Sequence, residues 1–341
     1  MYLQSIAHST PRTALTQQEC WAVLNQSQAL EPLTQRSVLL LEKILTGDSG
    51  IERRHFETES VETLFSLDAE SLNQQFERAA PRLSSQALRK ALDAAELQAT
   101  DLDALLICTC SGYLCPGVSS YVSQQMGLKT AAYLQDIVGL GCGAAIPTLR
   151  SAAGFLSAQP NAKVAVIAVE VCSAAFYLDN DPGVLISACL FGDAASASIW
   201  SMDSNRTGYR AANFDTLHRP EDRELLRFVN SGGKLRNKLH RTVPVKAGSA
   251  VAQLYSQTQH PAGERIVNHT GGRDVIDALE QVLPSELSPS RATLKRYGNT
   301  SSPSVLITLQ EMLEQDTEVK DLWLTSFGAG FAAHSVSLRR E

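Results

Sequence analysis

The sequence of 341 residues has no long apolar run, no excess of positive charge and no leader-like start. Its longest apolar segments, such as Val164–Val169 and Val184–Phe191, are too short to cross a bilayer, so we expect no membrane span. Lys and Arg total 30 against 36 Asp and Glu, a net charge of −6, which argues against nucleic-acid binding. The first eight residues lack a basic segment followed by an apolar one, so we expect no secretory signal.

The chain has few cysteines, and their number is odd. There are seven, and without a secretory signal they are expected to be reduced thiols in the cytoplasm. Cys108, Cys110 and Cys115 lie close together, but no second CxxC pair and no nearby histidine accompanies them. We therefore predict no metal site. Hydrophobic residues make up 44% of the chain, enough for a large core and too many for a disordered protein.

The hydrophobic pattern predicts an α/β fold after a polar, mostly helical first hundred residues. Helices are expected over Thr16–Asn25, which starts with a capping box, over Thr34–Leu45, and over Leu72–Leu97, broken at Pro81. Strands and helices then alternate. The strands expected in the first half are Ala104–Cys108, Tyr133–Val138, Ala162–Val171 and Ala194–Trp200, with helices at Ser119–Met126 and 143–157.

The second half repeats this order more faintly. Its expected strands are 265–268, 321–325 and 331–338, and its expected helices are 274–282 and 305–313. Leu190–Ile199 and Ser326–Val336 both contain Phe-Gly followed by small residues and a strand, which indicates an internal duplication. We predict two halves, residues 1–215 and 216–341, with Arg219–Lys246 as an insertion or connecting loop.

Cys142 lies in a Gly-Cys-Gly turn between an expected strand and an expected helix. At a helix N-terminus the free N–H groups and the macrodipole favour a thiolate, so this position suits a nucleophile. Two other interpretations remain open here: a packed core cysteine, and a dinucleotide loop, since Gly139, Gly141 and Ala144 fit G-x-G-x-x-A. The acid that such a loop needs is poorly placed, because Glu170 lies too far along the chain.

Two further turns carry polar side chains. His269 stands where an expected strand meets a Gly-Gly turn, a typical place for a site residue, although a lone histidine is more often structural. Asn299 precedes Thr300, Ser301 and Ser302, for which a helix-cap role is expected. Together, a thiol, an imidazole and an amide donor suit covalent acyl transfer, because the two donors can stabilise the oxygen charge that develops on a thioester.

With these motifs the sequence resembles the thiolase superfamily and, within it, the type III polyketide synthases of the chalcone and stilbene synthase-like kind. The resemblance runs from about Ile51 to the C-terminus. The segments that carry it are LGCGAAIPTLR around Cys142, Leu190–Asp193, NHTGG around His269, YGNTSSPS around Asn299, and Ser326–Gly330. It implies an α/β fold that is a duplicated thiolase-like arrangement, with two halves packed as α-β-α-β-α layers.

The resemblance also implies roles for single residues. Cys142 would accept the acyl group, and His269 would activate it and, with Asn299, bind the thioester oxygen during malonyl decarboxylation. Phe191 matches a gatekeeper phenylalanine, and Cys115 matches a residue that reaches into the partner subunit's cavity. The positions that match the cavity lining are Cys110, Ser111, Ser187 and Ser301.

The sequence departs from the family in Thr270, which follows His269 where the family has proline, and in Ser326–Gly330, which stands in place of GFGPG. Two further departures concern substrate binding. The second gatekeeper phenylalanine falls near Asn237, and the basic residues that hold the coenzyme A phosphates are missing apart from Lys43, which is at another register. The residues that could replace them are Arg53, Arg54, Lys234, Arg236 and Lys238.

The implied function is an acyltransferase that loads a starter on Cys142 and extends it with malonyl-CoA by decarboxylative Claisen condensation to a small polyketide. The starter would arrive on coenzyme A or an acyl-carrier protein. We expect a cytoplasmic homodimer without cofactor or metal. Two alternatives are an initiating 3-oxoacyl-acyl-carrier-protein synthase, whose Pro-His-Gln-Ala-Asn signature is absent, and a non-catalytic partner subunit, which would be expected to lose one of the three polar residues.

Overall fold

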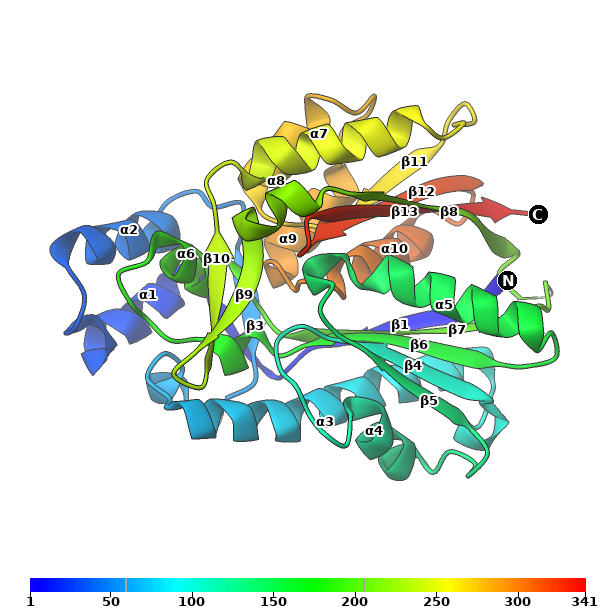
Figure 1. The fold of residues 1–341 in the computed structure, drawn as a ribbon, viewed down its shortest axis with the longest axis horizontal. Coiled ribbons are helices and arrows are strands. Elements are labelled where there is room, and N and C mark those ends of the chain that lie inside the picture. Colours follow the sequence, from blue (N-terminus) through cyan, green and yellow to red (C-terminus); the bar gives the residue numbers. More distant parts are fainter. Residues whose placement is uncertain (59, 205) are drawn as a thin grey trace.

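The computed structural model describes residues 1–58, 60–204 and 206–341. They form one nine-stranded β-sheet, two two-stranded sheets and three layers of helices, and the two halves of the nine-stranded sheet are called the first and the second sheet below. The layers alternate as α-β-α-β-α, and Figure 1 shows α5 and α10 between the two sheets, with α7 and α8 on one outer side and α3 and α4 on the other. This is the duplicated thiolase-like arrangement that the sequence resemblance implies. The fold prediction is therefore confirmed.

The two sheets have matching strand arrangements. The first runs in the spatial order β5 (Tyr133–Ile137), β4 (Ala104–Cys108), β6 (Val164–Glu170), β7 (Ala194–Ser201) and β1 (Tyr2–Ser9). The second runs β11 (Arg265–Asn268), β12 (Asp321–Gly328), β13 (Ala332–Arg340) and β8 (Tyr209–His218). In each sheet a parallel pair is followed by two antiparallel strands. The sheets join through one register pair, Tyr2 with Arg210.

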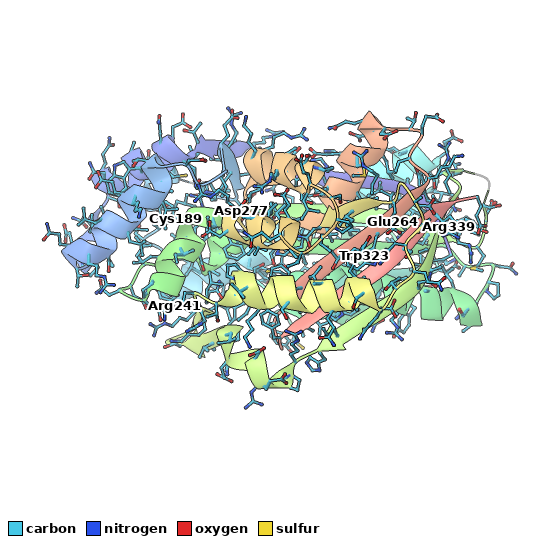
Figure 2. All side chains as sticks on the ribbon, turned by 90° about the horizontal axis from the view of Figure 1, so that it is seen from above. Cys189, Arg241, Glu264, Asp277, Trp323 and Arg339 are labelled. Carbon is cyan, nitrogen blue, oxygen red and sulfur yellow. The ribbon has the colours of Figure 1, made fainter. Side chains whose placement is uncertain are left out.

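Both faces of each sheet are covered, so its strands are buried on both sides. In β4, Leu106 and Cys108 pack in the central layer, whereas Leu105 and Ile107 pack in the outer core against α3. The helices are α3 (Ala69–Ala95), α4 (Val118–Met126), α5 (Ala145–Ala158), α7 (Val243–Ser256), α8 (Arg273–Glu280), α9 (Ser288–Tyr297) and α10 (Ser304–Gln315). Figure 2 shows α7 lying across the second sheet, where Trp323 of β12 is labelled.

A smaller group of elements caps one end of the layers. It contains α1 (Gln17–Gln26), α2 (Gln35–Thr46), α6 (Pro182–Leu190) and the short pair β2 (Thr13–Thr16) and β3 (Arg53–Phe56). The capping box predicted at Thr16 is present, because Thr16 and Glu19 exchange hydrogen bonds. The core of this cap includes Phe191 and has Cys142 packed against it. The cap therefore forms one side of the region around the predicted nucleophile.

The prediction of a mostly helical start misses β1, which is an internal strand of the first sheet. Its buried polar side chains conceal the strand pattern. Ser5 Oγ donates to Ala91 O at 2.6 Å, and Ser9 Oγ donates to Gln86 Oε1 at 2.9 Å. These bonds satisfy hydroxyls that would otherwise be costly to bury.

The predicted helix break at Pro81 is also wrong. Helix α3 continues through Pro81, which is buried within it. A proline removes one helical hydrogen bond, but here the helix lies along the first sheet and buries the apolar side chains Phe76, Leu83 and Leu88. The packing free energy exceeds the local cost.

The segment 219–246 is structured and not a plain connecting loop. It contains the hairpin β9 (Leu226–Ser231) and β10 (Lys234–Leu239), which packs against α6, and the start of α7. The predicted boundary after residue 215 falls inside β8. The division into residues 1–215 and 216–341 stays a prediction.

Candidate active site

Cys142 sits in a tight turn that only small residues can form. Gly141–Gly143 make a single 3₁₀ turn before α5, and Gly141 has φ +59°. A Cβ on Gly143 would come within 3.1 Å of the backbone N of Gly328 and 3.1 Å of the His334 ring. The Phe-Gly segment of the second half, Phe327-Gly328, thus meets the Cys142 turn, and a Cβ on Gly328 would lie only 2.4 Å from Gly143 N, so glycine is required at this close approach.

The Cys142 thiol is less acidic than the sequence predicts. Its Sγ accepts a hydrogen bond from Ser301 Oγ at 3.1 Å, which favours the thiolate. Desolvation by burial is larger, however, and raises the pKa of Cys142 to about 12, with a further contribution from Glu170. The expectation of a resting thiolate is therefore corrected: removal of water outweighs the helix N-terminus, and a base is needed to take the proton.

His269 is the predicted candidate for this base, and it is neutral in the structure. It follows β11 and is almost fully buried, and burial lowers its pKa to about 3. Its Nδ1 lies 2.6 Å from Ser304 Oγ, which donates its own hydrogen to Ser301 O at 2.8 Å. Ser304 Oγ must then accept from His269, so Nδ1 carries the proton and Nε2 keeps a free lone pair.

Asn299 is held by backbone groups on both sides of its amide. Nδ2 donates to Gly271 O at 2.9 Å, and Oδ1 accepts from Ser301 N at 2.8 Å. The backbone of Asn299 also bridges to Phe191. These bonds fix the amide plane and leave one Nδ2 hydrogen for another acceptor.

The residues 299–304 connect all three predicted catalytic positions. Ser301 bonds Cys142, Ser304 bonds His269, and Asn299 starts the segment. The cap role expected for Thr300, Ser301 or Ser302 is wrong, because no side chain caps α10. Ser302 Oγ bonds Glu170 instead.

A small cavity collects six of the seven predicted substrate-binding residues. Its volume is about 30 Å³. The predicted residues that line it are Cys110, Ser111, Ser187, Phe191, Asn237 and Ser301. Cys115, the seventh, is exposed and does not line the cavity of its own chain. The lining residues that sequence reasoning missed include Cys172, Phe176, Tyr177 and Phe228. Phe228 stands out in the sequence only as the aromatic residue of a charged stretch.

Residues 4–219 match the family described as FAE1/Type III polyketide synthase-like protein. The chain belongs to this family. Residues 261–340 match the C-terminal part of 3-oxoacyl-[acyl-carrier-protein] synthase III. The polyketide synthase resemblance is therefore confirmed, and the chain is an acyltransferase.

Similar proteins cover nearly the whole chain. The 1,3,6,8-tetrahydroxynaphthalene synthase of Streptomyces coelicolor is 26% identical over 95% of this chain and 88% of its own. The phloroglucinol synthase of Pseudomonas fluorescens is 25% identical over 95% and 94%. The crystal structure of the S. coelicolor enzyme, a bacterial type III polyketide synthase, has a TM-score of 0.88, 25% identity, and coverage of 100% and 99%.

Within this polyketide synthase-like chain, Glu170 is a further candidate site residue, which the sequence analysis considered only as the acid of a dinucleotide loop. It ends β6 and is fully buried. Its carboxylate accepts hydrogen bonds from Ser302 Oγ at 2.6 Å, Ser111 N at 2.9 Å and Cys110 N at 3.0 Å. It therefore ties the cavity wall after β4 to the segment beside Cys142. The sequence feature that could have identified Glu170 as a site residue is its place as the single acid near the end of the apolar run AKVAVIAVEV.

The suggested phosphate anchors are largely engaged elsewhere. Arg54 is fully buried and donates to Ala188 O and Phe191 O, so its suggested phosphate role is wrong. Arg236 and Lys238 both pair with Asp181, at 2.9 and 3.3 Å.

The described ranges also bear on membrane spans and metal sites. Across residues 1–58, 60–204 and 206–341 no helix is long and apolar enough to cross a membrane. The same ranges contain no group of three or more His, Cys, Asp or Glu side chains placed to hold a metal ion.

Proposed function

We propose that the protein loads an acyl starter on Cys142 and extends it repeatedly with malonyl-CoA to a small aromatic polyketide or pyrone. The observation that carries the proposal is the 299–304 segment, which hydrogen-bonds Cys142 and His269 and contains Asn299. The names of the relatives, which include tetrahydroxynaphthalene and phloroglucinol synthases, support this product class.

Loading transfers the acyl group from one sulfur to another. Cys142 Sγ attacks the thioester carbonyl, Nε2 of His269 takes the thiol proton, and the coenzyme A thiolate leaves and regains a proton. Sulfur-to-sulfur exchange replaces one thioester by another, so its equilibrium is near balance. The Nε2 lone pair of His269 is available to take this proton, because Nδ1 is engaged with Ser304.

Extension needs a stabilised enolate. The malonyl carboxylate leaves as carbon dioxide, its C–C bond electrons form the enolate, and the oxygen charge is held by Asn299 Nδ2–H and by the Nε2–H that His269 holds after it has taken the Cys142 proton. The enolate carbon then attacks the acyl carbonyl, and Cys142 leaves as the thiolate. One such hydrogen-bond donor is worth about a hundred- to a thousandfold in rate.

The alternative is an initiating 3-oxoacyl-acyl-carrier-protein synthase, which stops after one condensation. The match of residues 261–340 to the C-terminal part of that synthase family supports this alternative. The match of residues 4–219 and the full-length relatives weigh more heavily toward repeated extension. The presence of Cys142, His269 and Asn299 together argues against a non-catalytic subunit.

We propose that the substrates are a starter thioester of coenzyme A or a carrier protein and malonyl-CoA, and that the chain is a homodimer in the cytoplasm. Free cysteines at all seven positions fit a reducing compartment. The outermost strand β5 exposes Tyr133, and Tyr113 and Val138 nearby are also exposed. An apolar sheet edge of this kind suits pairing with a second copy.

The test is incubation of the purified protein with malonyl-CoA alone and with a panel of starter thioesters, followed by mass analysis of products. Polyketides that contain two or more extension units are expected. A product with a single extension would select the initiating synthase. No product and no carbon dioxide release with any thioester would overturn both.

A further inference from the structure

A buried histidine–glutamate pair lies outside the candidate active site, between the end of α7 and the start of β11. His260 Nδ1 is 2.5 Å from Glu264 Oε2, and the two side chains are only 12% and 4% exposed. The His260 ring is stacked on Tyr255 of α7 and meets the buried Trp323 of β12 edge to face. Figure 2 labels Glu264 and Trp323 near the C-terminal end of α7. The cluster therefore joins the loop 257–264 to α7 and to the second sheet.

The hydrogen bonds fix one proton of His260 and leave a second one shared. Nε2 lies 2.8 Å from Tyr255 O, and a carbonyl oxygen only accepts, so Nε2 carries a hydrogen. Nδ1 can then bond Glu264 only if one more proton lies between the imidazole and the carboxyl group. Without that proton, the Nδ1 lone pair would face a carboxylate oxygen at 2.5 Å, and the two would repel each other. A single titratable proton therefore holds the pair together.

The surroundings of Glu264 favour its protonated form. Burial is the largest cause and raises the pKa of Glu264, an effect that His260 opposes in part. Asp321 raises this pKa further, and Arg339, which pairs with Asp321 at 2.8 Å, lowers it. Tyr255, whose own pKa is raised by burial and by Glu264, is the other titratable neighbour.

The sign of the pH effect follows from the raised pKa of Glu264. The folded chain keeps this proton at a pH where the unfolded chain has released it. The stability that the proton contributes is therefore complete below the ordinary carboxyl pKa, and it is lost as the pH rises through the raised value. Alkaline pH weakens the contact between the loop 257–264 and α7.

The strand next to this pair leads to a residue of the candidate active site. Strand β11 begins directly after Glu264, and His269 follows its last residue. The strand has four residues and lies at the edge of the nine-stranded sheet, beside β12. A short edge strand has few backbone hydrogen bonds of its own, so its first residues depend on the loop that precedes them.

We propose that His260 and Glu264 form a proton-dependent latch, which fixes the loop 257–264 and the start of β11 while the shared proton is present and releases them at alkaline pH. The release is local, because the side chains of Ile266 and Val267 keep β11 buried in the core. The latch is independent of the proposed function, since it operates in the folded chain without substrate.

Hydrogen exchange of the full chain, followed by peptide mass spectrometry from pH 6 to pH 9.5, measures the opening of residues 257–268. After correction for the base-catalysed intrinsic rate, the opening constant of wild type should rise about tenfold or more, since one released proton changes an equilibrium by up to about tenfold per pH unit. Glu264→Gln offers His260 Nδ1 an amide donor that does not titrate in this range, so its opening constant should change less than about twofold. Glu286→Gln, at an exposed position of the same half, is the matched control and should behave as wild type.

A second measurement tests the latch even if Glu264→Gln does not fold. In proton NMR of wild type, the proton shared by His260 and Glu264 should give a far-downfield resonance at pH 6 that is lost as the pH rises, and His260→Gln assigns it by its absence. A resonance that is missing at pH 6, or that persists unchanged to pH 9.5, would overturn the latch. An opening constant with the same pH dependence in wild type and Glu264→Gln would overturn it as well.

Discussion

The single hydrogen of Ser304 Oγ decides which nitrogen of His269 can act as a base. Because that hydrogen goes to Ser301 O, His269 holds its proton on Nδ1 and offers Nε2. The same segment places Ser301 Oγ on Cys142 and Ser301 N on Asn299. One stretch of backbone therefore sets the state of the base, the environment of the thiol and the orientation of the amide.

The partly buried Cys142 thiol should react slowly with alkylating agents near neutral pH. Its pKa is raised to about 12, so the thiolate fraction grows about tenfold per pH unit across pH 7–10. We expect the rate of iodoacetamide labelling at Cys142, followed by peptide mass spectrometry, to rise through this range without a plateau. Exposed Cys115 is the internal reference for reagent quality.

A plateau already near pH 7 would show a resting thiolate and contradict this account of Cys142. It would favour the prediction of a thiolate that was made from the Gly-Cys-Gly turn alone.

The sequence identifies the candidate nucleophile, His269 and Asn299, because each stands at a strand-to-helix turn in a recognisable motif. It cannot give the pKa, which depends on how much water the cap core and residues 299–304 exclude.

At the scale of elements, Arg54 joins β3 to the end of α6. Its guanidinium donates to Ala188 O and Phe191 O at 2.7 and 2.8 Å and to Gln17 Oε1 at 2.8 Å, and it lies over the Phe56 ring. A cation at a helix C-terminus also interacts favourably with the helix dipole. Figure 2 labels Cys189, the neighbour of these carbonyl groups on α6. Arg54 thereby positions the cavity residue Phe191.

Arg54→Ala should lower the free energy of unfolding by about 3 kcal/mol or more, because buried carbonyl groups lose a charged donor. Arg53→Ala, next along β3 and exposed, should change it by less than about 0.5 kcal/mol. Urea denaturation of both variants is the measurement. Equal stabilities of the two variants would mean that the Arg54 contacts contribute little.

The elements show where sequence reasoning works and where it stops. Strands β4 and β6 were predicted within two residues at each end, because both faces are buried and the runs are apolar. Strand β1 was missed since its buried serines are satisfied only by distant partners such as Ala91 O. The hairpin β9–β10 was missed because its charged residues pair with Asp181 and Glu224, which lie outside its strands.

At the scale of the whole molecule, the predicted role of Cys115 depends on assembly, because this residue would line the cavity of the partner subunit and not that of its own chain. The side chain is exposed in the single chain, so enlarging it should not overpack a core. Cys115→Phe should keep the melting temperature within about 2 °C and keep malonyl decarboxylation, but shift products toward fewer extensions if the loop walls the partner's cavity. Product profiling, melting curves and native mass spectrometry check this together.

An unchanged product profile in a confirmed dimer of Cys115→Phe would remove the cross-subunit role. A lowered melting temperature with unchanged products would assign Cys115 to packing at an interface. The duplicated halves were foreseen from the two Phe-Gly segments, of which the second, Phe327-Gly328, contacts the Cys142 turn in the structure. Assembly has no such internal signal, because a surface that pairs with a second copy looks like any exposed strand edge.

The central claim is that Cys142 carries the acyl group while Asn299 serves the decarboxylation. The most direct test follows acyl-Cys142 by intact mass and carbon dioxide from carboxyl-labelled malonyl-CoA in parallel. Asn299→Ala should still acylate but release carbon dioxide about a hundredfold more slowly than wild type, and Cys142→Ala should not acylate. Wild-type carbon dioxide release by Asn299→Ala, or an adduct that persists on another residue in Cys142→Ala, would contradict the account.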